Sequence, residues 1–304
     1  MPDSCADNGV LASHHNPRAR LAELLRAASL EIYAQKDTGE TLAGFFRAGA
    51  DIYISYLPGD DYRKRVAVAA SVRRAGFNPV MHVPARQMTS RDCLDDFLGL
   101  ARQEAGVERV LLIAGDSARP RGPFESSLDI ILSGLLQRHS IGYVDVAGHP
   151  EGHSSLANDQ LGQILATKCD AARAAGLGFA IVSQFCFDPR PIADWLRALH
   201  RSGFDVPIRI GLAGPANPMT LLKFALRCGV GNSLAALQKH ASTIGHLLRD
   251  TGPEGVVRGL GPVLLEPAGR CVESFHFFPF GGIVKTSAWL RQNLALLDAD
   301  ERPH

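Results

Sequence analysis

The chain has 304 residues, of which 46% are hydrophobic and 21% charged, and its formal net charge is +1. This length allows a large buried core, and the balanced charge gives no electrostatic reason to expect a nucleic acid or a membrane surface as partner. No apolar run approaches the roughly 20 residues that a membrane-spanning helix needs. We expect residues 1–17 to form a flexible tail, because they include acidic residues and histidines and lack the apolar segment of a secretory signal.

Strand-like runs alternate with helical patterns from the beginning of the chain to its end. Between the strands, apolar residues recur three and four positions apart at 61–75, 91–106, 155–175 and 189–201, which predicts helices. A further helical stretch is expected at 233–249, before a Gly/Pro-rich piece that extends to 269. The eight predicted strands are residues 29–35, 51–57, 78–84, 109–115, 141–148, 178–184, 207–214 and 274–280.

Several of these strands are almost wholly apolar, for example residues 110–114 and 179–182. Such runs are typical of parallel strands that are buried on both faces. Eight strand–helix units therefore predict an α/β protein, a single-domain (β/α)₈ TIM barrel over residues 18–304. An open, doubly wound sheet is the alternative that the same pattern allows.

The six cysteines lie far apart and form no C-x-x-C pair. Scattered cysteines in a chain of this size are typical of reduced, packed thiols, so we expect a cytoplasmic protein. Cys186 lies near several candidate site residues, but no activating base stands beside it in sequence.

In a (β/α)₈ barrel the active site lies where strands end and loops begin, and this chain places polar groups and glycines at many of those ends. Glu31 has apolar neighbours on both sides, and an inward-facing glutamate there would be partly desolvated and suited to proton donation. A glutamate that faces the surface or pairs with an arginine is the alternative. His82 is an isolated histidine on the apolar third strand, where a packed core histidine is commoner than a functional one.

Gly115 and Asp116 end strand four, and two arginines follow in the next loop. Glycine lets a ligand approach the backbone, and Arg119 and Arg121 are suitable donors to phosphate. An aspartate that caps the next helix, with arginines that face solvent, is the alternative. Gln184 ends strand six and offers both a donor and an acceptor to a heteroaromatic ring edge.

The segment after strand five carries His149, Glu151 and His153. The order H-x-E-x-H is not the helical zinc motif H-E-x-x-H, and Pro150 and Gly152 oppose one regular helix. A loop that binds a polar cofactor is favoured over a metal site, and no metal is predicted. No G-x-G-x-x-G opens a helix, so a Rossmann cofactor site is not supported.

The ordered set of motifs resembles the methylenetetrahydrofolate reductase family, of which the chain is expected to be a divergent member. Departures from the family pattern occur at Ala114, where an arginine is common, at His149, where a tyrosine is common, and at residues 279–282. The matching segments are residues 29–31, His82, 114–124, 148–153, 168–171, 183–188, 211–215, Phe224 and 275–277.

The resemblance implies a barrel that holds FAD, which passes hydride between NADH or NADPH and the one-carbon unit of tetrahydrofolate. It implies that Glu31 is a general acid that helps to open the methylene bridge, and that Asp116 stabilises positive charge near flavin and folate. Gln184 and Phe224 are the implied substrate-binding residues, and Lys285, a turn after the departure at residues 279–282, is predicted to bind substrate as well. The cofactor-binding residues predicted here are His82, Gly115, Asp116, Arg119, Arg121, His149, His153 and Lys168.

We therefore predict a flavin-dependent oxidoreductase that interconverts 5,10-methylenetetrahydrofolate and 5-methyltetrahydrofolate with NAD(P)H. Its physiological direction, its choice between NADH and NADPH, and whether it forms a homo-oligomer stay open. Two alternatives also stay open. One is a flavin-free folate- or pterin-dependent enzyme on the same barrel, such as a methyltransferase. The other is a non-catalytic protein that binds folate or flavin.

Overall fold

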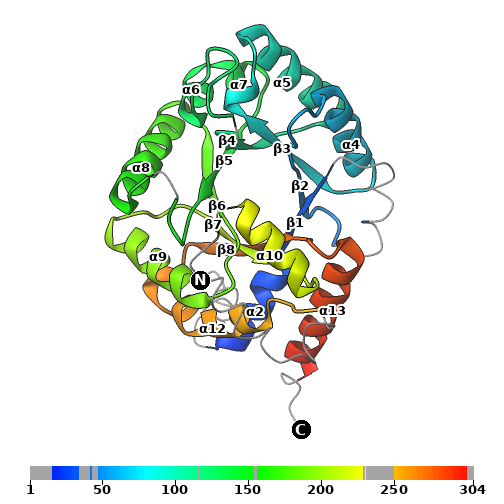
Figure 1. The fold of residues 1–304 in the computed structure, drawn as a ribbon, viewed down its shortest axis with the longest axis vertical. Coiled ribbons are helices and arrows are strands. Elements are labelled where there is room, and N and C mark those ends of the chain that lie inside the picture. Colours follow the sequence, from blue (N-terminus) through cyan, green and yellow to red (C-terminus); the bar gives the residue numbers. More distant parts are fainter. Residues whose placement is uncertain are drawn as a thin grey trace, which may run out of the picture. The chain divides into compact units, whose positions relative to one another are not determined.

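A computed structural model describes residues 16–33, 42, 47–115, 117–153, 156–228, 230 and 250–299. Eight parallel strands follow one another in sequence order around a closed barrel, with helices between them (Figure 1). The predicted (β/α)₈ barrel is therefore confirmed, and an open doubly wound sheet is excluded. The chain divides into two compact units, Ser29–Gln184 and Met1–Ala28 with Phe185–His304.

The unit Ser29–Gln184 holds the first six strands, each hydrogen-bonded in parallel to the next. Helix α4 packs on β2 and β3, α6 on β4, and α8 on β6, so the helices cover one face of this wall. The elements are β1 (Ser29–Ile32), β2 (Asp51–Ile54), α4 (Tyr62–Arg74), β3 (Asn78–Pro84), η1 (Ala85–Gln87), α5 (Arg91–Ala105), β4 (Arg109–Ile113), α6 (Ser127–Leu132), α7 (Leu135–Arg138), β5 (Tyr143–Gly148), α8 (Asn158–Ala174) and β6 (Gly178–Ser183).

The strand register decides which side chains of this unit share a face. Residues paired across parallel strands project to the same side, and so do residues two apart along a strand. The face away from the helices carries polar groups, whereas the opposite face is apolar and buried, with Ile52, Met81 and Val110 each at 0% exposure. Register and alternation place on the inner face Glu31, Tyr53, Val80, His82, Arg109, Leu111 and Asp145.

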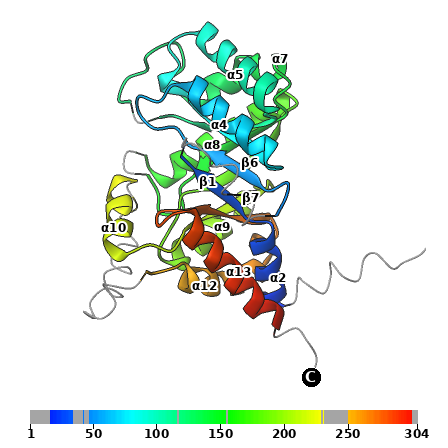
Figure 2. The same ribbon diagram turned by 90° about the vertical axis from the view of Figure 1, so that its right-hand side faces the viewer.

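The described part of the second unit holds the last two strands and five α-helices, of which α12 packs against α2 and α9, and α13 against α2 (Figure 2). Strands β7 and β8 pair in parallel and place Gly211 beside His276. The elements are α2 (Pro17–Arg26), α9 (Pro189–Arg201), β7 (Ile208–Ala213), α10 (Pro218–Arg227), α12 (Glu254–Leu265), η3 (Pro267–Gly269), β8 (Val272–Phe278) and α13 (Ile283–Ala299).

Three helices of this unit begin in the same way. An Asn or Asp side chain accepts hydrogen bonds from the first free backbone N–H groups, and a proline occupies the first helical position. The capping residues are Asn16 for α2, Asp188 for α9 and Asn217 for α10. Each of these Asn-Pro or Asp-Pro pairs predicts a helix start from sequence alone. Proline suits the first helical position because the backbone N–H that it lacks would have no partner there, and because its φ angle is already helical.

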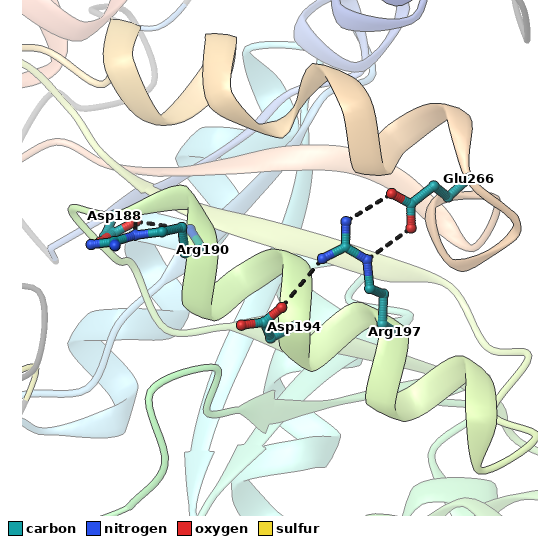
Figure 3. A network of polar contacts seen from close by, with 5 residues as sticks. All are labelled: Asp188, Arg190, Asp194, Arg197 and Glu266. Atoms are coloured by element: carbon teal, nitrogen blue, oxygen red, sulfur yellow. Dashed lines mark hydrogen bonds and ion pairs between the residues drawn. The ribbon is translucent and has the colours of Figure 1, made fainter.

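Helix α9 is joined to the 3₁₀ turn η3 by a polar network (Figure 3). Arg197 donates from Nε to Glu266 Oε2 at 2.8 Å and from Nη2 to Oε1 at 2.7 Å, which is a two-point contact. Its Nη1 also contacts Asp194 Oδ1 at 3.2 Å, one turn earlier on the same helix. This network orients the connection that leads from α12 into β8.

Several predicted boundaries are wrong by one to three residues. Strand β3 has the predicted bounds, but β4 ends at Ile113, two residues early, and β8 runs over Val272–Phe278. The Gly/Pro-rich piece, in which no helix was expected, contains α12, because its Val and Leu side chains are buried and Gly259 lets Pro189 approach closely. The expected tail ends at Pro17, which is the first residue of α2, whereas residues 1–15 and the predicted helix at 233–249 lie outside the described residues.

Within the described ranges, the structure contains no helix with the length and apolar character needed to cross a membrane. The five described cysteines are free thiols, and Cys186 is buried at 2% exposure.

Candidate functional site

Glu31 and His82 meet on the inner face of the first unit. His82 Nε2 lies 3.5 Å from Glu31 Oε2, and the two side chains are 8% and 12% exposed. Burial raises the pKa of Glu31 above its ordinary value, and the charge of protonated His82 opposes that rise. A buried carboxyl with a raised pKa keeps its proton closer to neutral pH, which suits a proton donor.

A second polar chain lies on the same face of the wall. The Tyr53 hydroxyl donates to Asp145 Oδ2 at 2.6 Å, and Asp145 Oδ1 lies 3.2 Å from Arg109 Nη1. Tyr53 and Asp145 are fully buried, whereas Arg109, at the first position of β4, is half-buried and its guanidinium lies 4.9 Å from the centroid of the Tyr143 ring. The carboxylate therefore has both a neutral and a charged donor, as a buried charge requires.

His82 is also held from behind through its backbone. Arg65 of α4 is 1% exposed and donates from Nη1 to the His82 carbonyl oxygen at 2.7 Å. The guanidinium lies between the rings of Tyr56 and Phe97, at 5.4 Å and 5.1 Å from their centroids. Burial lowers the pKa of Arg65 to about 10.

The loop after β5 brings His149 and His153 together, with ring centroids 5.2 Å apart and planes at 88°. Burial, together with the charges of His153 and Lys168, lowers the pKa of His149 to about 4. Burial also lowers the pKa of Lys168, which lies on α8. The His149 imidazole and the Lys168 amine are half-buried and have lowered pKa values, and the His153 imidazole is more exposed. Together they form a donor set that an anionic ligand would stabilise.

The loop after β4 is fastened to the loop after β3. The Arg86 guanidinium donates to the carbonyl oxygens of Ser117 at 3.2 Å and Glu125 at 3.0 Å. Arg121 donates to Gln87 Oε1 at 3.5 Å and is exposed. Gly115 has a φ of 88°, a conformation that glycine adopts without strain.

Two further predicted residues of this unit lie in the loops after β4 and β6. Arg119 is exposed, and Gln184 is half-buried directly after β6, where its backbone N–H donates to the Gly148 carbonyl at 2.8 Å. Asp116, predicted to stabilise charge, lies outside the described residues.

In the second unit, Phe224 of α10 stacks on Phe280, with ring centroids 4.1 Å apart and planes at 18°. The turn that carries Phe280 sits very close to the loop after β7, because a Cβ on Gly281 would lie 1.9 Å from the Pro215 carbonyl oxygen. Lys285 on α13 pairs with Asp250, Nζ to Oδ2 at 2.6 Å. One face of Phe224 is therefore covered by the chain itself.

Sequence reasoning singled out Glu31 and His82 separately and did not pair them, and it missed Tyr53, Asp145 and Arg65. An available indication was that Tyr53 and Asp145 are polar residues inside otherwise apolar strands. Nothing local indicates a buried arginine in α4, whose other buried residues are small or apolar. Among the described residues, no group of three or more His, Cys, Asp or Glu has an arrangement that could hold a metal ion.

The fold and these sites define a (β/α)₈-barrel protein with a buried acid on its inner face. No protein-family model matches the chain. The chain is 27% identical to methylenetetrahydrofolate reductase 2 of Saccharomyces cerevisiae (strain ATCC 204508 / S288c) over 210 residues, 66% of this chain and 32% of the yeast protein. It is thus a divergent relative of methylenetetrahydrofolate reductase, as the ordered motifs predict, and the match spans about a third of that relative's length.

Two of the solved structures that align with the chain each cover most of its length. An uncharacterized protein from Clostridium thermocellum that binds two copies of 5-methyl-5,6,7,8-tetrahydrofolic acid aligns with a TM-score of 0.58 at 12% identity, over 90% of this chain and 94% of that one. Dihydropteroate synthase from Thermus thermophilus aligns with a TM-score of 0.47 at 14% identity, over 90% and 93%. At such identities the first match supports the barrel fold.

Proposed function

We propose that the chain is a flavin-dependent oxidoreductase that interconverts 5,10-methylenetetrahydrofolate and 5-methyltetrahydrofolate with NADH or NADPH. The observation that carries the proposal is the buried Glu31, with its raised pKa, on the inner face of a barrel whose sequence is similar to methylenetetrahydrofolate reductase. We propose the reaction from the similarity to the yeast reductase, and Glu31 as the proton donor that this reaction needs.

Glu31 acts as the general acid. Burial favours the protonated form of its carboxyl, which can donate that proton to the folate nitrogen that leaves the methylene bridge. His82 beside it stabilises the carboxylate that is left, when the imidazole is protonated. Asp116 is proposed from the sequence as the group that stabilises positive charge on the opened one-carbon unit.

The donors present fit an anionic dinucleotide such as FAD. Lys168, His149 and His153 would hold it, since a phosphate beside Lys168 and His149 would favour the charged forms of these two groups. Arg119 and Arg121, both exposed, are further donors to phosphate, and Gly115 allows close approach to the backbone. When bound, the flavin would supply hydride transfer between the nicotinamide and the folate.

Substrate recognition is proposed for three residues. Gln184 would bind the pterin edge with its amide donor and acceptor. Phe224 would contact the folate or nicotinamide with the face that Phe280 leaves uncovered, and Lys285 would contact the folate tail. Because Lys285 pairs with Asp250, folate would have to compete with that carboxylate.

The experiment has two arms. Purified protein with added FAD should show a bound-flavin absorption spectrum that bleaches with anaerobic NADH or NADPH. E31Q should keep that bleaching but lose folate turnover by about 100-fold to 10,000-fold, because the amide has no acidic proton. E108Q, which changes an exposed glutamate paired with Arg102, is the matched control and should retain turnover.

Absence of flavin binding at micromolar concentration would reject the flavin and leave the second candidate, a flavin-free folate enzyme on the same barrel. Ala114 motivates that candidate, because it stands where the reductase family commonly has an arginine. Undiminished folate turnover in E31Q would reject the acid.

A further inference from the structure

Glu31 and His82 lie on strands that are not neighbours. Strand β2 separates β1 from β3, and Tyr53 of β2 is the register partner of Glu31. The carboxylate and the imidazole nevertheless approach to 3.5 Å on the inner face, where both are largely buried. We propose that Glu31 and His82 share one proton, so that His82 is a positioning residue that sets the protonation state of the acid.

Tyr53 fixes the imidazole from the side. Its ring meets the His82 ring edge-on, with centroids 6.4 Å apart and planes at 79°. The Tyr53 side chain is restrained in this rotamer, because its hydroxyl donates to Asp145 and Asp145 forms an ion pair with Arg109. The backbone of His82 is anchored separately by Arg65. Both ends of the histidine are thus held, and its Nε2 stays directed at Glu31.

Among the described residues with printed contacts to His82, Glu31 is the oppositely charged group that lies nearest to its ring. On the inner face Asp145 and Arg109 form an ion pair, so their fields largely cancel at His82. Arg65 contacts the histidine from α4 through the carbonyl oxygen, and its charge disfavours protonation of the ring. Tyr53 carries no charge near neutral pH. A proton on the imidazole is therefore stabilised mainly by the Glu31 carboxylate.

One proton can reside on either member of the pair. With the proton on Oε2, both groups are neutral, which burial favours; with it on Nε2, they form an ion pair, which their attraction favours. At 3.5 Å the contact is longer than an ordinary hydrogen bond, so a small approach completes the transfer. Transfer between them changes neither the number of bound protons nor the net charge.

The catalytic consequence rests on the proposed function. Each donation from Glu31 to substrate removes one proton from a buried carboxyl, which must be replaced before the next turnover. A proton that reaches His82 from solvent can pass from Nε2 to Oε2 and restore the acid. His82 therefore returns the proton to Glu31, whereas the family resemblance implied that it binds the flavin.

The test measures the pairing without any ligand. The Glu31 carboxyl is followed by ¹³C NMR in glutamate-labelled protein and identified by its loss in E31Q, and the His82 ring is followed in the same pH series. H82Q removes the neighbouring cation, so the pKa of Glu31 should rise by about one unit or more. E31Q should lower the pKa of His82 by the same amount, because coupling between two sites is reciprocal.

H139Q is the matched control. It removes another histidine–carboxylate contact, His139 Nε2 to Asp95 Oδ1 at 2.7 Å, on the helical side of the unit, and should leave the Glu31 titration unchanged. A Glu31 titration that is the same in H82Q as in wild type overturns the proposal, and so do unequal shifts of the two groups. If H82Q fails to fold, the His82 shift in E31Q gives the same coupling from the other side.

The experiments can reject the Glu31–His82 pairing and the proposed function independently of each other. Reciprocal shifts in a protein without flavin or folate activity support the pair and reject the reductase. An active reductase whose Glu31 and His82 titrate independently rejects the pair alone. In the active enzyme, H82Q should also move the alkaline limit of folate turnover to higher pH, which a loss of packing by itself would not do.

Discussion

Burial distinguishes the two histidines that follow β5. His149 is half-buried and its pKa falls to about 4, whereas His153 is exposed. A histidine whose pKa is lower in the folded than in the unfolded state takes up its proton more readily on unfolding. Its contribution to stability is therefore present above the ordinary pKa of 6.5 and is lost as the pH falls toward 4.

We predict that the free energy of unfolding declines as the pH falls from about 6.5 to about 4, and that H149Q declines less steeply over this window. Glutamine has no titrating group, so the variant does not gain a proton on unfolding at this position. Urea unfolding at a series of pH values measures both slopes. Equal slopes in the two proteins would contradict a lowered His149 pKa.

At the scale of elements, the turn between β8 and α13 decides how Phe280 is presented. Phe280 reaches Phe224 because Gly281 passes against the loop after β7 and Gly282 adopts a φ of 100°. Two glycines in succession thus permit an aromatic stack between α10 and the end of β8. A polar turn in this position would leave that face of Phe224 free for other contacts.

G281A should destabilise the protein by about 1–3 kcal/mol, because the new Cβ would meet the Pro215 carbonyl oxygen at 1.9 Å and backbone cannot yield cheaply. The midpoint of urea unfolding measures the loss. G162A is the control, since Gly162 lies in α8 with no atom near its Cβ position, and alanine there should stabilise by about 0.5–1 kcal/mol. Equal effects from both substitutions would mean that the close approach does not constrain the turn.

At the scale of the whole molecule, this chain matches about a third of the yeast reductase. The predicted flavin donors, His149, His153, Lys168, Arg119 and Arg121, all belong to the unit Ser29–Gln184. We expect the chain to bind FAD by itself. A ligand that binds the native state and not the unfolded chain raises stability by mass action.

FAD at about 100 times its Kd should therefore stabilise the native state by about 2.7 kcal/mol and raise the melting temperature. Differential scanning calorimetry measures the shift. Riboflavin, which has no phosphate, is the control and should stabilise less at the same concentration, because Lys168 and the arginines would have no anion to bind. A melting temperature that FAD leaves unchanged at every concentration would reject binding by this chain.

Much of the architecture follows from the sequence alone. Eight apolar runs separated by helical periodicity predict a barrel because parallel strands buried on both faces need helices between them. The starts of α2, α9 and α10 are equally readable, since an Asn or Asp before a proline caps a helix wherever it occurs. Glu31 was identified as a candidate acid because it interrupts an apolar strand.

Tertiary structure alone decided which of these side chains meet. The contacts of Glu31 with His82, and of Asp145 with Tyr53 and Arg109, depend on the register of neighbouring strands, which no local pattern specifies. The helix α12 forms in a segment rich in glycine and proline because burial against α2 and α9 outweighs weak intrinsic preference. Composition and periodicity act along the chain, whereas distances between strands arise only when the sheet is assembled.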